Sequence, residues 1–208
     1  MVNLTAHLRI TSLFIAAILV TVSLASIGMM QTNAAAAEHT LYQSNFRQNS
    51  AFTTKTTEEG STETTAYAVA HTNSYGDEII CIGYYEYDAN TDTYPTDFFG
   101  CGPAAQLAIN GLHSATFSGT ITGSDFPSDK EMTVTVIGDL TATGKPETRV
   151  DRQHINSEFI TFVSHVNGQT VSASGSLDIS GDLTFGTDDA TGNIDNARSG
   201  SLLVYRNS

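Results

Sequence analysis

The chain is poor in cations, cysteine, proline and tryptophan: its 208 residues include nine lysines and arginines, two cysteines, four prolines and no tryptophan. Of these shortages, the shortage of cations excludes the largest number of binding partners. All 22 acidic residues stand from Glu38 onward, against eight cations after Arg9, so this part of the chain has a net charge of −14. Such a surface repels DNA, RNA and anionic lipid head groups. We therefore expect no nucleic-acid partner and, beyond the N-terminus, no membrane partner.

The sequence patterns of several enzyme and zinc-binding classes are also missing. The chain has no Cys-x-x-Cys or His-x-x-x-His spacing, no H-E-x-x-H motif, no G-x-S-x-G elbow and no phosphate-cradling glycine loop. His154 stands near Asp151 and Glu158, a pattern that is also typical of a charged strand end. A hydrolase that uses this histidine or an unidentified pair of carboxylates remains one alternative.

Only one long apolar run is present, from Ile10 to Ile27. It follows a weakly basic start and precedes a run of alanines, Ala34 to Ala37, which is the pattern of a secretory signal peptide. We expect residues 1–37 to be this signal, with cleavage after Ala37; a retained membrane anchor is the alternative. The mature protein is then secreted, or periplasmic if the source cell has an outer membrane.

Two cysteines in an exported chain predict one disulfide, Cys81–Cys101. A bond that closes a loop of about 20 residues stabilises a protein by roughly 3 kcal/mol, mainly through the unfolded chain. The competing interpretation, a zinc or nucleophile site, lacks partner ligands at short spacing.

A period-two alternation of apolar and polar residues dominates the later sequence. It is clearest in "TVSASGSLDISGDLTF" (170–185), then in residues 132–143 and 112–123, with further strands expected near 65–75, 78–87, 150–166 and 192–206. We predict an all-β fold, an antiparallel meander of about seven to nine strands closed as a small barrel. Glycines on the inferred inward faces favour the barrel over the alternative, a β-sandwich.

The expected boundaries place a flexible, threonine-rich segment at 38–64 and a single β domain at 65–208. Within the flexible segment, "TLYQSNF" is an alternative candidate for a strand that adds to a neighbouring subunit. Asn167-Gly168 is the strongest short hairpin signal in the sequence. A two-residue turn there would place Phe159 and Val163 on the outside, as an apolar patch for a partner, unless a bulge swaps the two faces.

The loop between the cysteines is rich in oxygen ligands. Asp88, Asn90, Asp92 and Asp97 resemble the first half of a calcium loop, but Thr93 and Phe99 occupy the positions where that loop needs glycine and a bidentate acid. A looser Ca²⁺ site is one hypothesis, and an ordinary polar hairpin tip is the other. No other cofactor is expected.

The same loop is rich in tyrosine. Tyr84, Tyr85, Tyr87 and Tyr94 surround the acids and form a possible interaction surface for a protein partner or a sugar. Burial of these rings beside the disulfide is the simpler alternative. The leading expectation for function is therefore a secreted, non-enzymatic β domain with a structural or protein-interaction role, including self-association. A barrel that binds a small apolar ligand is the second alternative.

Overall fold

The computed structural model describes residues 40–73, 76–156 and 160–206, which all belong to one unit, Ala34–Ser208. Every regular element in these ranges is a β-strand. The described ranges contain no helix that is long and apolar enough to cross a membrane. The expected signal peptide lies outside the described residues. The strands are β1 (Thr40–Glu59), β2 (Thr62–Asn73), β3 (Glu78–Asp88), β4 (Thr93–Pro103), β5 (Gln106–Asn110), β6 (Ser114–Asp125), β7 (Lys130–Ala142), β8 (Glu147–Asn156), β9 (Ile160–Gly181) and β10 (Phe185–Arg206).

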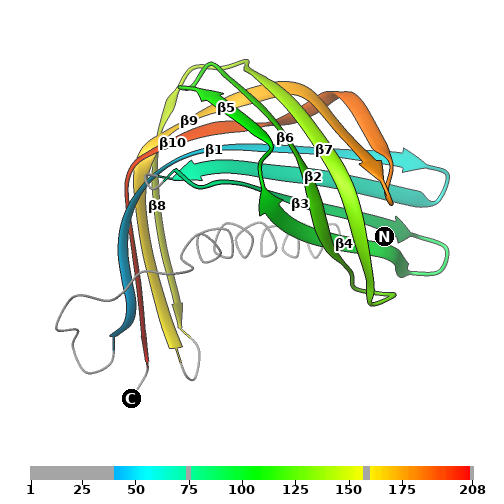
Figure 1. The fold of residues 1–208 in the computed structure, drawn as a ribbon, viewed down its shortest axis with the longest axis horizontal. Coiled ribbons are helices and arrows are strands. Elements are labelled where there is room, and N and C mark those ends of the chain that lie inside the picture. Colours follow the sequence, from blue (N-terminus) through cyan, green and yellow to red (C-terminus); the bar gives the residue numbers. More distant parts are fainter. Residues whose placement is uncertain (1–39, 74–75, 157–159, 207–208) are drawn as a thin grey trace, which may run out of the picture. The chain divides into compact units, whose positions relative to one another are not determined.

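Eight strands form a closed ring of antiparallel pairs in the order β1, β2, β3, β4, β6, β7, β9, β10 and back to β1 (Figure 1). The ring is not a regular barrel. β4 pairs with β6 only from Phe98 to Gly100, and β5 pairs with the first part of β6 instead. The predicted all-β antiparallel architecture is thus confirmed, while the finer prediction, a meander of about seven to nine strands closed as a small barrel, is not.

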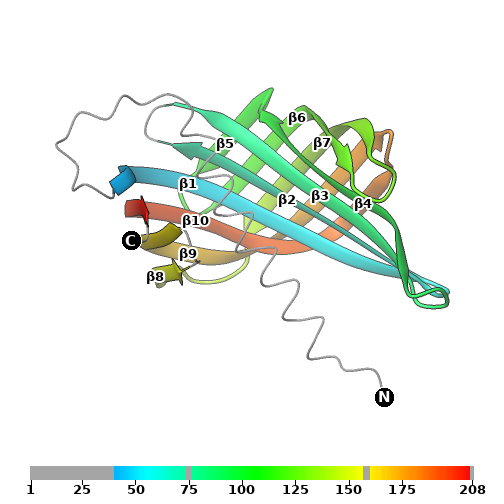
Figure 2. The same ribbon diagram turned by 90° about the horizontal axis from the view of Figure 1, so that it is seen from below.

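Three long strands leave the ring together. β9 pairs with β10 along its length, but with β7 only over Ala173–Gly181 and with β8 only over Thr161–Thr170. β1 likewise pairs with β2 only from Gln48 onward. A four-stranded sheet in the order β8, β9, β10, β1 therefore continues beyond the ring (Figures 1 and 2). We call it the extension; it comprises residues 40–47, 147–156, 160–170 and 195–206.

The expectation of a flexible segment at 38–64 is wrong for most of its length, because β1 spans Thr40–Glu59 and β2 begins at Thr62. β1 lacks an apolar period because its ring-facing positions carry small or polar side chains, among them Ala51 and Thr53, both fully buried. Hydrogen bonding to β10 on one side and β2 on the other holds this strand in place. The β fold therefore begins well before residue 65.

Asn167-Gly168 is not a turn but lies in the middle of β9, opposite β8 on one side and β10 on the other. The register of β10 shifts beside it, between Ala197 and Ser199. A Cβ atom at Gly168 would lie 2.0 Å from the carbonyl oxygen of Asn196, so the glycine permits a close approach of two strands. The expected strand at 150–166 is consequently two strands, and the chain between them, with Glu158 and Phe159, lies outside the described residues.

The ring interior is filled by alternating side chains, as the period-two pattern predicted. Its largest cluster includes Phe98, Phe117, Ile121 and Tyr84, and a second cluster around Leu140 lies nearer the extension. Gly138 faces the ring of Phe117, whose nearest atom would be 2.2 Å from a Cβ at that position. An inward glycine here accommodates an aromatic ring of the protein itself. The small-apolar-ligand alternative stays a prediction.

Candidate functional site

The predicted disulfide is present. Cys81 on β3 lies directly opposite Cys101 on β4, and their sulfur atoms are 2.08 Å apart. The bond joins the two strands of the hairpin that carries the tyrosine-rich loop. The turn of that hairpin, residues 89–92, lies at the far end of these strands from the disulfide.

The β3–β4 turn is tied to the neighbouring β1–β2 turn. The hydroxyl of Ser61 donates to Asp88 Oδ1 (3.2 Å), the amide of Asn90 donates to Ser61 Oγ (2.7 Å), and the Ala89 N–H donates to the Ser61 carbonyl (2.9 Å). Asp88 also accepts the backbone N–H of Asn90 (2.9 Å) and the hydroxyl of Thr91 (3.1 Å). The Asn90 N–H, with these hydroxyls, lowers the pKa of Asp88. Asp88 therefore acts here as a turn-stabilising residue.

The four proposed calcium ligands do not share this turn. Asp97 lies within β4, opposite Tyr85, and its backbone N–H donates to Asp125 Oδ1 at 2.9 Å. Among the described residues, no three His, Cys, Asp or Glu side chains are grouped as a metal site requires. The Ca²⁺ hypothesis stays a prediction with these residues as its ligands.

Cross-strand register brings acids and tyrosines together on the outer face of the ring, opposite the side that carries Tyr84. Glu58 of β1 lies opposite Glu63 of β2, and Glu63 lies opposite Tyr87 of β3. Two residues before Tyr87 on the same face of β3, Tyr85 lies opposite Asp97 of β4. We call this group the tyrosine–acid patch; it comprises Glu58, Glu63, Tyr85, Tyr87, Asp92, Tyr94 and Asp97.

The Tyr94 ring contacts two other tyrosine rings of the patch. The Tyr94 ring lies 5.2 Å from that of Tyr87 in a tilted geometry and 6.2 Å from that of Tyr85 edge to face, measured between centroids. Tyr94 is 44% exposed, and the Tyr87 hydroxyl donates to Asp92 at 2.9 Å. Burial raises the pKa of Tyr85, and the hydrogen bond to Asp92 raises that of Tyr87. Both phenols therefore stay neutral near pH 7.

Other residues expected at an interaction surface lie elsewhere. Tyr84 is 5% exposed and packs edge to face against Phe185 in the core, with centroids 6.4 Å apart. Val163 is half-buried in the extension, between His154 of β8 and Leu203 of β10. Of the two alternatives for these tyrosines, burial describes Tyr84, because successive side chains of a strand face opposite sides and Tyr84 faces away from Tyr85.

Acids of the patch lie close to other acids, both inside and outside the patch. Glu58 and Glu63 are like charges at directly opposed positions, which destabilises an antiparallel pair. Burial, and then the neighbouring Asp125, raise the pKa of Asp97. These two glutamates were not among the residues singled out from the sequence, because their pairing depends on the register of β1 and β2. The signal that could have found them is "EEGSTE", two acidic stretches flanking a glycine turn.

Comparison with protein-family models, curated proteins and solved structures finds no match for this chain. His154, the residue of the hydrolase alternative, is exposed on β8, and its neighbour Glu158 lies outside the described residues. That alternative stays a prediction.

Proposed function

We propose that this protein is a non-enzymatic extracytoplasmic binding domain whose tyrosine–acid patch binds cationic side chains of a protein partner. The disulfide indicates an oxidising, extracytoplasmic environment. We also propose that the protein is secreted through a cleaved signal peptide, with a periplasmic location as the alternative.

The observation that carries the proposal is the juxtaposition of Glu58 with Glu63 beside the contacting rings of Tyr87 and Tyr94. A cation placed between the two glutamates relieves their repulsion, so that part of the binding energy is already stored in the unbound protein. A guanidinium group suits the site best, because it bonds a carboxylate in a fork and also stacks on an aromatic face. An exposed tyrosine adds about 0.5–1 kcal/mol to such an interaction.

The test is calorimetric titration of the disulfide-intact protein with an arginine-rich peptide and with a glutamate-rich peptide of equal length. The absence of tryptophan allows tyrosine fluorescence to report the same binding. We expect only the arginine-rich peptide to bind, and Glu63→Gln and Tyr94→Ala each to weaken it by about tenfold, through loss of one charge contact or one stacking contact.

Asp178→Asn is the matched control. It removes one exposed carboxylate from β9, outside the patch, and so has the same effect on net charge as Glu63→Gln. Equal weakening by both variants would show that peptide binding follows net charge alone and would remove the patch from the proposal.

A further inference from the structure

Arginine and lysine are segregated between the two parts of the sheet. The extension contains five arginines and three acids, a net charge of +2, and every arginine after Arg9 lies there. Residues 48–146 and 171–194, which make the ring, contain three lysines and 17 acids, a net charge of −14. The arginines of the extension are Arg47, Arg149, Arg152, Arg198 and Arg206.

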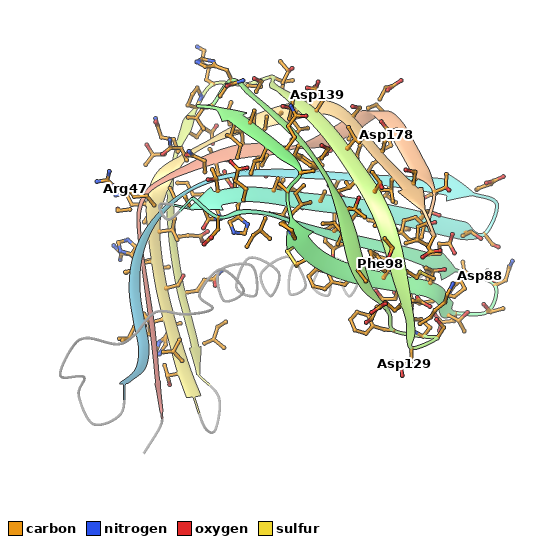
Figure 3. The ribbon with its side chains drawn as sticks, in the orientation of Figure 1. Arg47, Asp88, Phe98, Asp129, Asp139 and Asp178 are labelled. Carbon is orange, nitrogen blue, oxygen red and sulfur yellow. A yellow bond between two sulfur atoms is a disulfide. The ribbon has the colours of Figure 1, made fainter. Side chains whose placement is uncertain are left out.

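The arginines and the patch lie at opposite ends of the sheet. In Figure 3, Arg47 lies on the left, where β1 bends from the ring into the extension, while Asp88 and Asp129 lie on the right, where the hairpin turns gather. Arg47 and Arg152 are exposed, and the register β8–β9–β10–β1 puts them on the same face of the extension. Within the described residues, exposed arginines therefore lie on the extension and the acids of the patch lie on the opposite side of the ring.

Arg149 does not contribute to this exposed charge. Its guanidinium contacts Asp151 at 2.6 Å and Asp195 at 2.7 Å, so its charge is balanced within the extension. The charge that a partner meets on this face comes from Arg47 and Arg152.

The two edges of the extension lack a second strand partner within the part of the chain that the structure describes. Among the described strands, β8 pairs only with β9, and the first eight residues of β1, Thr40–Arg47, pair only with β10. A sheet edge that lacks a strand partner gains stability from contact with another surface.

We infer that the extension of one copy of this chain docks on the tyrosine–acid patch of a second copy, so that the protein assembles head to tail. This inference rests on the proposed function, because it names the cationic partner of the same patch. The exposed arginines of the extension supply the guanidinium groups that Glu58, Glu63 and Tyr94 accommodate. The contact is heterologous, and two copies joined in this way still have one extension and one patch outside the contact, so assembly continues into a chain or a closed ring.

Ionic strength distinguishes this contact from non-specific clustering. Copies with a net charge of −13 repel one another at about 0.01 M salt, where the Debye length is about 30 Å. At about 0.15 M the Debye length is about 8 Å, so distant charges no longer repel while charges in the contact still attract. At about 1 M the contact itself is screened. We therefore expect assembly to pass through a maximum near 0.15 M salt.

The test is sedimentation velocity of the disulfide-intact protein with two complementary variants. Arg47→Glu/Arg152→Glu inactivates the extension, and Glu63→Lys/Tyr94→Ala inactivates the patch. We expect the wild type to form oligomers whose size grows with concentration, and each variant alone to remain monomeric. An equimolar mixture should form 1:1 dimers and nothing larger, because only one working extension and one working patch remain.

Lys145→Glu is the control for reversal of a cation outside the extension, and it should assemble as the wild type does. Circular dichroism of each variant checks that it is folded. Assembly that persists in both variants, or a mixture that stays monomeric, would overturn the inference. A wild type that is monomeric at every salt concentration but binds the arginine-rich peptide overturns the inference and leaves the proposed function intact; failure of both assays removes both.

Discussion

Asp125 organises the turn between β6 and β7 through a carboxylate that is almost fully buried. The residue is 3% exposed; it accepts the Asp97 N–H at 2.9 Å and the hydroxyl of Ser128. Burial alone would raise the pKa of Asp125, but the hydrogen bonds from Ser128 and Asp97, with Lys130 nearby, together lower it.

We expect Asp125→Asn to lower the free energy of unfolding at pH 7 by about 1–3 kcal/mol, because charge-assisted hydrogen bonds to a buried group are lost. A lowered folded-state pKa means that the stabilisation is complete above the unfolded value of about 3.9 and is lost as pH falls toward the folded value. The difference between wild type and variant in urea denaturation should therefore shrink between pH 5 and about pH 2. A difference independent of pH would contradict this role.

Gly138 of β7 lies opposite Phe117 of β6, and the absence of a side chain at Gly138 leaves room for the Phe117 ring. Gly138→Ala forces a Cβ into the Phe117 ring, which we expect to cost about 1–3 kcal/mol of stability in thermal or urea unfolding. Adding Phe117→Leu should recover part of the loss, because the smaller side chain vacates the overlap. Gly144→Ala is the matched control, since its new Cβ would meet only ordinary contacts at 3.7 Å or more, and it should change stability little.

At the scale of single strands, the disulfide joins β3 to β4 within one hairpin. We expect Cys81→Ala/Cys101→Ala to lower the unfolding free energy by about 3 kcal/mol, because the sequence separation of 20 residues sets the entropy that the bond removes from the unfolded chain. Guanidinium denaturation measures this change. A reducing agent should destabilise the wild type equally and leave the double variant unaffected; equal stability of wild type and variant under oxidising conditions would refute the estimate.

Arg149 fastens the edge strand β8 to the rest of the extension. Its side chain contacts Asp195 of β10, two strands away, and the residue opposite it on the intervening strand β9 is Gly168. Asp195 is 7% exposed and otherwise accepts the amide of Asn193 at 2.7 Å. Arg149→Met leaves this carboxylate without its cation, which we expect to cost about 1–3 kcal/mol.

Hydrogen exchange should detect that loss locally, as faster exchange of amides in residues 147–156. Arg152→Met, on the same strand but with an exposed side chain, is the matched control and should leave exchange unchanged in dilute protein. Equal acceleration in both variants would show that the stability of β8 depends on its number of arginines and not on the contacts of Arg149.

The sequence predicted some strands well and others poorly, for identifiable physical reasons. β7 was located almost to the residue because its valines face the core while its threonines face solvent. β1 was missed because its buried positions are alanine and threonine, which give no apolar period. The hairpin turn predicted at Asn167-Gly168 was wrong, because the same dipeptide also occurs where two strands approach closely. The position of the neighbouring strand decides between the two structures.

The candidate site was predictable only in part for a related reason. Tyr85, Tyr87 and Tyr94 belong to one hairpin, so they could be grouped from the sequence. Glu58 and Glu63 join them across two further strand pairings, which a linear pattern does not contain. Asp97 was grouped with Asp88, Asn90 and Asp92, whereas it lies within β4 opposite Tyr85, because the length of β4 was not apparent from the sequence.

At the scale of the whole molecule, β1, β9 and β10 each run without interruption through both the ring and the extension. A pulling force applied to the extension along these strands travels through covalent backbone into the wall of the ring. Interstrand hydrogen bonds lie across the strand direction, so such a pull shears many of them at once instead of peeling them apart singly. Within one copy, the three continuous strands therefore share a load that is applied along them.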